Sequence, residues 1–131
     1  MSGETNLDKL LQSIQPKLMD ETFVFCTVPK GKEREIQDLS VSYFREAEAD
    51  AAILKETDAQ AIGLEYEYPS KMITLEVHSG LDAVGFLAAI TAVLAKAGIS
   101  VNPVSAFYHD HLFVPVDRAE DTMKLIKSMG K

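Results

Sequence analysis

The hydrophobic positions between residues 72 and 100 change their spacing, and this change predicts a strand followed by a helix. Residues 72–78 alternate between apolar and polar side chains, which is typical of a strand with one apolar face. Residues 84–97 instead repeat large apolar side chains every three or four positions, as an amphipathic helix does. The apolar helix positions at this spacing are Leu87, Ile90 and Leu94.

The turn between this strand and this helix combines glycines with a helix N-terminus. Gly85 allows backbone or ligand to approach closely, and Asp82 could cap the helix by accepting a hydrogen bond from a backbone N–H. Unpaired N–H groups and the positive end of the helix dipole favour an anion at such a turn. The candidate ligand-binding residues are His78, Ser79, Gly80, Leu81, Asp82, Val84, Gly85 and Phe86.

The rest of the second half predicts a β-hairpin and a last helix. Residues 99–108 and 111–116 have the composition of strands, and a two-residue turn at 109–110 would join them. Asp117 and Glu120 have the spacing of a capping pair, which predicts that the last helix begins there. The order of elements in the second half is therefore strand, helix, strand, strand, helix.

Two features of this half favour self-association. Pro103 cannot donate a backbone hydrogen bond, so its strand should lie at a sheet edge, where a second copy could pair with it. The helix at 84–97 also carries a second apolar row, which needs cover of its own. That row is Phe86, Val93 and Ala97, and the candidate interface residues at the edge are Asn102, Pro103 and Ser105.

The first half predicts a short N-terminal helix followed by strands. Leucine and isoleucine recur at helical spacing in residues 7–14, with Thr5 or Asn6 as the cap and Pro16 as the stop. A single helical turn is predicted at residues 57–63, ending at Gly63. Strands are predicted at 23–28, at 64–68 and within 41–55, where a turn near 48–50 separates two strands and a helix is the alternative.

The order of elements in residues 72–129, with the Asp82, Gly85 and Gly98-Ile99 pattern, resembles an ACT domain. That resemblance implies an α+β, ferredoxin-like fold with an antiparallel sheet and helices on one face. Only the terminal strand of the usual arrangement is missing, and we expect the first half to supply it. We therefore expect two ACT-like halves, a degenerate one at 1–70 with the N-terminal helix and a regular one at 71–131.

Composition narrows the range of partners. The net charge is −7, and the acidic excess lies within residues 1–70, which disfavours nucleic acid and anionic membranes as partners. The single cysteine, Cys26, excludes an internal disulfide. Together with the lack of a charged and then apolar leader at the start of the chain, it indicates a cytoplasmic protein.

Catalytic chemistry has no recognisable motif in the sequence. No nucleophile elbow, phosphate-binding glycine loop or Cys-x-x-Cys pair occurs, so we expect no enzyme and no cofactor. The sequence His109-Asp110-His111 is the best candidate for a metal site, but it has no companions of suitable spacing, so we expect no metal. A small metal-dependent enzyme remains an alternative at these residues.

The resemblance to ACT domains points to a regulatory or sensor protein that binds a small molecule, and specifically an amino acid. Backbone N–H groups of Val84, Gly85 and Phe86 would hold the carboxylate, and Asp82 or His78 would meet the ammonium or the side chain of the ligand. A homodimer or a higher homo-oligomer is expected. The alternative is an ACT-type scaffold that oligomerises or docks onto an enzyme without binding a ligand.

Overall fold

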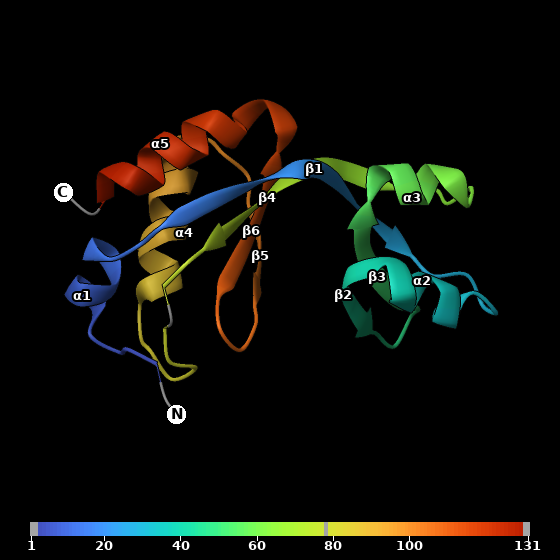
Figure 1. Ribbon diagram of the computed structural model, residues 1–131, viewed down its shortest axis with the longest axis horizontal. Helices are drawn as coiled ribbons and strands as arrows, with labels where there is room; N and C mark the ends of the chain where they lie inside the picture. The colour runs from blue at the N-terminus through green and yellow to red at the C-terminus, as the bar shows by residue number, and fades with distance from the viewer. Residues whose placement is uncertain (1–2, 78, 130–131) are drawn as a thin grey trace. The chain divides into compact units, whose positions relative to one another are not determined.

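The computed structural model describes residues 3–77 and 79–129, which form an α+β fold (Figure 1). These residues contain α-helices, β-strands and one short 3₁₀ helix, η1. Their order is α1 (Leu7–Gln12), β1 (Pro16–Thr27), α2 (Glu33–Leu39), β2 (Ser40–Arg45), β3 (Asp50–Lys55), α3 (Glu56–Ala61), β4 (Glu67–Leu75), α4 (Phe86–Lys96), β5 (Asn102–Ser105), β6 (Asp110–Pro115), η1 (Val116–Arg118) and α5 (Ala119–Met129). The expected α+β class is confirmed.

The chain divides into two compact units that do not follow the order of the sequence. Unit 1 consists of Met1–Met19 and Lys71–Lys131, and unit 2 consists of Asp20–Ser70. The long strands β1 and β4 each begin in one unit and end in the other. The sequence-based division at residue 70 remains a prediction about the two halves of the chain, whereas these units are defined by contacts in space.

Each unit has the strand order of a ferredoxin-like sheet. The order in unit 1 is β1-β4-β6-β5, and the order in unit 2 is β2-β3-β1-β4. The N–H of Glu76, just after β4, donates to the carbonyl of Gln15, just before β1, over 2.9 Å. The terminal strand that the second half lacks is therefore supplied by the first part of β1, as predicted.

The core of unit 1 forms where α4 and α5 pack against the sheet. Phe86, Ile90 and Leu94 are buried on one side of α4, while Leu87 is only half-buried. The predicted helix is therefore confirmed, but Phe86 belongs to its buried face and not to an outer row. Leu10 from α1 is fully buried in the same core. The N-terminal helix begins as predicted, because the Asn6 side chain accepts a hydrogen bond from the N–H of Lys9 over 3.0 Å.

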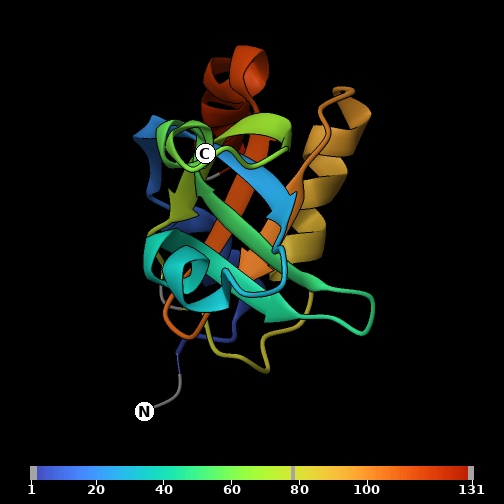
Figure 2. The same cartoon turned by 90° about the vertical axis from the view of Figure 1, so that its right-hand side faces the viewer.

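Unit 2 has a smaller core, in which α2 and α3 contact β3. Figure 2 shows α2 beside the hairpin of β2 and β3, whose turn at 46–49 agrees with the predicted strands. Helix α2 was not predicted from the sequence, because it is short and mostly charged and Ile36 is its only fully buried residue. Cys26 is buried here, and burial raises the pKa of its thiol.

Strand β4 joins the two strands that were predicted separately at residues 64–68 and 72–78. Its residues run without interruption through Pro69, although proline cannot donate to the ladder. Tyr68 has a positive φ of 61°, so the backbone is irregular just before the proline. The hydroxyl of the buried Ser70 donates to the carbonyl of Phe23 over 3.0 Å, which ties this stretch to β1.

None of the described helices combines the length and the apolar character that a membrane-spanning helix requires.

Candidate functional site

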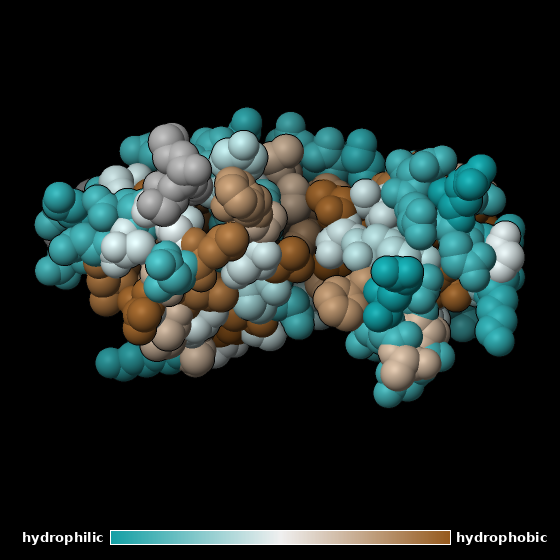
Figure 3. Space-filling view, turned by 90° about the horizontal axis from the view of Figure 1, so that it is seen from below, coloured by the Kyte–Doolittle hydropathy of each residue, from teal (hydrophilic) through white to brown (hydrophobic). Residues whose placement is uncertain are grey.

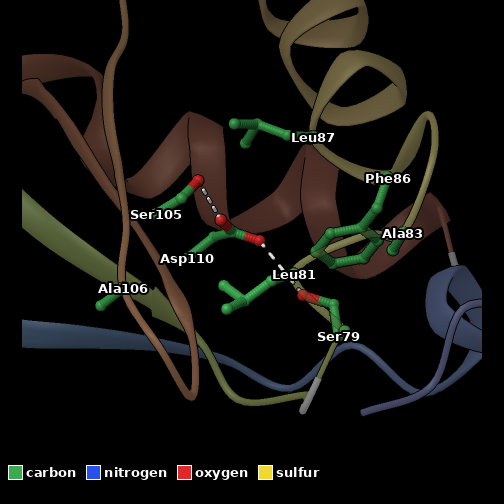
Figure 4. Close-up of a pocket in the computed structure, with 9 residues that line it drawn as sticks. Ser79, Leu81, Ala83, Phe86, Leu87, Ser105, Ala106 and Asp110 are labelled. Carbon is green, nitrogen blue, oxygen red and sulfur yellow. Dashed lines mark hydrogen bonds between the residues drawn. The ribbon is translucent and has the colours of Figure 1, made fainter. Parts of the chain in front are cut away.

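A cavity of about 110 Å³ in unit 1 contains much of the predicted site (Figure 4). It lies between the loop that joins β4 to α4 and the hairpin ends of β5 and β6. The residues that line it are Ser79, Gly80, Leu81, Ala83, Phe86, Leu87, Ser105, Ala106 and Asp110. The cavity is small beside the roughly 300–1,000 Å³ of pockets that hold drug-sized ligands.

Helix α4 begins beside this cavity without an internal cap. Gly85 is the N-cap residue with a φ of 88°, and no side chain among the described residues caps the first turn. The first N–H groups of an α-helix have no intrahelical acceptor, and the first turn of α4 contains no acidic residue. The prediction that Asp82 caps this helix is wrong, because the N-cap is Gly85, three residues further along the chain. Within the described residues, no side-chain acceptor occupies the positive end of α4.

The N-terminal segment fixes the start of the β4–α4 loop. Glu4 and Ser79 form a parallel β-bridge, and the N–H of Gly80 donates to the carbonyl of Glu4 over 2.9 Å. A Cβ atom added to Gly80 would lie 3.1 Å from the carbonyl oxygen of Gly3, so a side chain here would force its neighbours to shift by a few tenths of an ångström. Glu4 accepts hydrogen bonds from the N–H groups of Asn6 and Thr5, which lower the pKa of its carboxyl.

Asp110, on the β5–β6 hairpin, places a carboxylate in the lining of the cavity. Its side chain is 8% exposed, and it accepts hydrogen bonds from the hydroxyls of Ser105, over 2.5 Å, and Ser79, over 3.5 Å. Figure 4 shows Asp110 between these two serines. Asp110 is the first residue of β6 and pairs with Ser105, so the hairpin loop has four residues, 106–109. The predicted two-residue turn at 109–110 is therefore wrong.

Large apolar side chains are exposed on the two loops that border the cavity. Leu81 and Val84 on the β4–α4 loop are 73% and 84% exposed. On the β5–β6 loop, the rings of Phe107 and Tyr108 are also exposed and pack edge to face, with centroids 5.0 Å apart. Figure 3 shows hydrophobic side chains gathered on the face of unit 1 that carries these loops.

The histidines near Asp110 do not form a metal site within the described residues. Nδ1 of His111 and the hydroxyl of Thr74 share a hydrogen bond of 2.9 Å, and burial, with the neighbouring His109, lowers the pKa of His111. Nδ1 of His109 is buried without a hydrogen-bond partner among the described residues. No group of three potential metal ligands occurs in residues 3–77 and 79–129.

The structure brings only part of the predicted ligand-binding set to the cavity. Ser79, Gly80, Leu81 and Phe86 line it, whereas Asp82, Val84 and Gly85 are outside its lining and His78 lies outside the described residues. Of the predicted interface residues, Asn102 and Pro103 are exposed on β5, which is an edge strand as expected, and Ser105 lines the cavity. Whether these residues bind a ligand or a second copy remains a prediction.

Sequence reasoning missed Asp110 as a site residue. Asp110 is in phase with Leu112 and Val114, both fully buried, so it continues an apolar row of β6 with a charge. A carboxylate in phase with buried residues is the signal in the sequence that could have identified it. The turn predicted at 109–110 concealed that signal, because it placed Asp110 outside the strand.

The two ferredoxin-like units, with a cavity at the first strand-to-helix loop of one of them, place the chain in a class of small α+β proteins. The chain belongs to the ACT-domain family. One ACT-domain model matches residues 2–71 and a second matches residues 67–128. No curated protein matches the chain.

Solved structures agree with this assignment. A Vibrio cholerae protein of unknown function, described as a possible transport protein, is 37% identical, with a TM-score of 0.84 over 95% of this chain and 96% of that chain. An Agrobacterium tumefaciens protein is 19% identical, with a TM-score of 0.69 over 89% of each chain. The regulatory subunit of aspartate kinase from Thermus thermophilus is 10% identical, with a TM-score of 0.67 over 91% of this chain and 97% of that chain, and shows likeness of fold.

Proposed function

We propose that this protein is a regulatory or sensor protein that binds a small amphoteric metabolite, an amino acid, in the cavity of unit 1. The observation that carries the proposal is the uncapped N-terminus of α4 beside this cavity. Phe86 and Leu87, the first two residues of α4, both line the cavity. A ligand carboxylate there would receive hydrogen bonds from backbone N–H groups and would lie at the positive end of the helix dipole.

The carboxylate site that we propose uses the backbone of Val84, Gly85 and Phe86, with Ser79, Gly80 and Leu81 around it. The positive φ of Gly85 turns the chain into the helix at this point. A polar side chain would complete recognition of an amino acid by meeting its ammonium group, and Asp82 and His78 are the candidates that the sequence predicts for that contact. We propose no catalytic role. We also propose a cytoplasmic location, which rests on the single cysteine, Cys26.

Thermal denaturation in the presence of the twenty common L-amino acids tests this function. A ligand that binds only the folded state stabilises it by RT ln(1 + [L]/Kd), which is about 2.7 kcal/mol at one hundred times Kd. We expect at least one amino acid at millimolar concentration to raise the midpoint by several degrees, and the others to leave it unchanged. If no amino acid raises the midpoint, the function is instead that of a ligand-free scaffold.

We also propose that the protein is a homo-oligomer, paired through the exposed edge of β5. Sedimentation at micromolar concentration should show a species larger than one chain. A lysine at Asn102, which is exposed on β5, should increase the fraction of single chains, because charges on an edge strand oppose pairing. Val41→Lys makes the same change on β2, the edge strand of unit 2, and should leave the distribution as it is. A single-chain species alone in the wild-type sample would contradict the proposal.

A further inference from the structure

We propose that Asp110 is the residue that selects the class of ligand, because its carboxylate pairs with a protonated amine in the cavity. This inference rests on the proposed function. Asp110, and not Asp82, is then the partner of the ammonium group. The resulting ligand class is a small α-amino acid, with its carboxylate at the N-terminus of α4 and its ammonium at Asp110.

Asp110 is buried without a cationic partner among the described residues. Its hydrogen-bond donors among the described residues are two hydroxyl groups, and no ion pair within residues 3–77 and 79–129 involves it. Burying a charge is unfavourable unless an opposite charge and hydrogen bonds compensate. A carboxylate that is 8% exposed and lines a cavity would therefore gain most from a cationic ligand.

Two serines orient the carboxylate of Asp110. Ser105 donates to Oδ1 of Asp110 and Ser79 donates to Oδ2, so each carboxylate oxygen has one donor among the described residues. A carboxylate offers about four acceptor positions in total, which leaves room for further donors on both oxygens. Ser79 is on the β4–α4 loop and Ser105 is on β5, so residues from both walls of the cavity orient the carboxylate (Figure 4).

The cavity combines opposite charges in a small space. The cavity has the positive end of α4 at one side and Asp110 at the other, within about 110 Å³. A zwitterion satisfies both ends at once, whereas a simple carboxylic acid leaves Asp110 unpaired. The remaining walls include the apolar side chains of Leu81, Ala83 and Leu87, which offer no partner for a second charged group.

Asp82 is neither buried nor part of the cavity lining. Its side chain is exposed and it does not line the cavity, although it lies on the same loop. Water already solvates an exposed carboxylate and screens its attraction for a ligand, so its contribution to affinity should be small. Asp82 therefore provides a matched control with the same charge.

The test compares amino acids with analogues that carry a hydroxyl in place of the amine. Glycine, L-alanine, L-serine and L-valine are titrated calorimetrically against glycolate, L-lactate, L-glycerate and L-2-hydroxyisovalerate, using the full-length wild-type, Asp110→Asn and Asp82→Asn proteins. For wild type and Asp82→Asn, we expect at least one amino acid to bind ten-fold more tightly than its hydroxy acid. For Asp110→Asn, we expect that amino acid to bind at least ten-fold more weakly, so that the preference for the amine disappears.

Different failures have different meanings. Binding of an amino acid that Asp110→Asn leaves unchanged, or that Asp82→Asn abolishes, would overturn the role of Asp110 while the proposed function stands. Absence of binding by all four pairs would also overturn it. In that case the proposed function survives only if another amino acid in the thermal panel binds.

A second measurement distinguishes ligand selection from a structural role. In denaturant unfolding without added ligand, we expect Asp110→Asn to have the same midpoint as wild type or a higher one. The amide can still hydrogen-bond to Ser105 and Ser79, and the unpaired buried charge is removed. A clearly lower midpoint would show that the carboxylate stabilises the fold, and would contradict the inference.

Discussion

Replacement of Gly85 by valine is expected to abolish amino-acid binding and to lower the free energy of unfolding by about 1 to 3 kcal/mol. Gly85 has a φ of 88°, in the left-handed region that a β-branched residue strongly disfavours. Space is not the obstacle, because a Cβ atom there would meet only Leu7 Cδ2, at an ordinary 3.7 Å. The strained backbone would relax by rotating, and the N–H groups at the start of α4 would turn away from the cavity.

Gly98 provides the matched control for this prediction. It follows the other end of α4, has a φ of 74°, and a Cβ atom there would have nothing within 4 Å. Gly98→Val should therefore cost similar stability while amino-acid binding stays at the wild-type level. Unfolding in denaturant and calorimetric titration with the four amino acids measure the two effects separately. Wild-type affinity in a folded Gly85→Val protein would show that the N-terminus of α4 is not the carboxylate site.

Truncation of Leu10 to alanine is expected to lower the free energy of unfolding by about 2 to 5 kcal/mol, the usual cost of a leucine removed from a close-packed core. Leu10 is fully buried, and it belongs to the core that α4 and α5 form with the sheet of unit 1. The cavity left behind would be lined by residues from the second half of the chain. A six-residue helix is not stable by itself, so its contribution lies in this packing.

Leu11 is the control, because it is adjacent in α1 but only half-buried. Leu11→Ala should cost clearly less than Leu10→Ala, with helix propensity changed equally in both variants. Denaturant unfolding, followed by circular dichroism, gives both values. Equal losses would mean that α1 contributes through its helicity and not through the burial of one face.

The N-terminal segment matters to a site in the second half of the chain because both belong to unit 1. The first part of β1 supplies the fourth strand of unit 1, and residues just before α1 hold the β4–α4 loop. The β-bridge between Glu4 and Ser79 and the close approach of Gly80 to Gly3 are part of this contact. The candidate site therefore depends on residues more than seventy positions away from it in the sequence.

The sequence by itself determined the elements whose signals are local. The helical spacing of residues 84–97 reflects one buried face, and α4 forms there. Asn6 caps α1 through a side chain three residues from its donor, and Pro103 lies on an edge strand because it lacks an N–H. Each of these features depends on residues within a few positions of one another, so the pattern along the chain contains the whole physical cause.

Only the tertiary structure decided which carboxylate lies in the cavity and how the two halves share their strands. Asp82 and Asp110 are both acidic residues near a turn, and the register of β5 with β6 buries one while solvent surrounds the other. Likewise, Pro69 is accommodated inside β4 because Tyr68 adopts a positive φ and Ser70 bonds to β1. These outcomes depend on hydrogen bonds and packing between residues far apart in the chain, and no local period of apolar residues records such contacts.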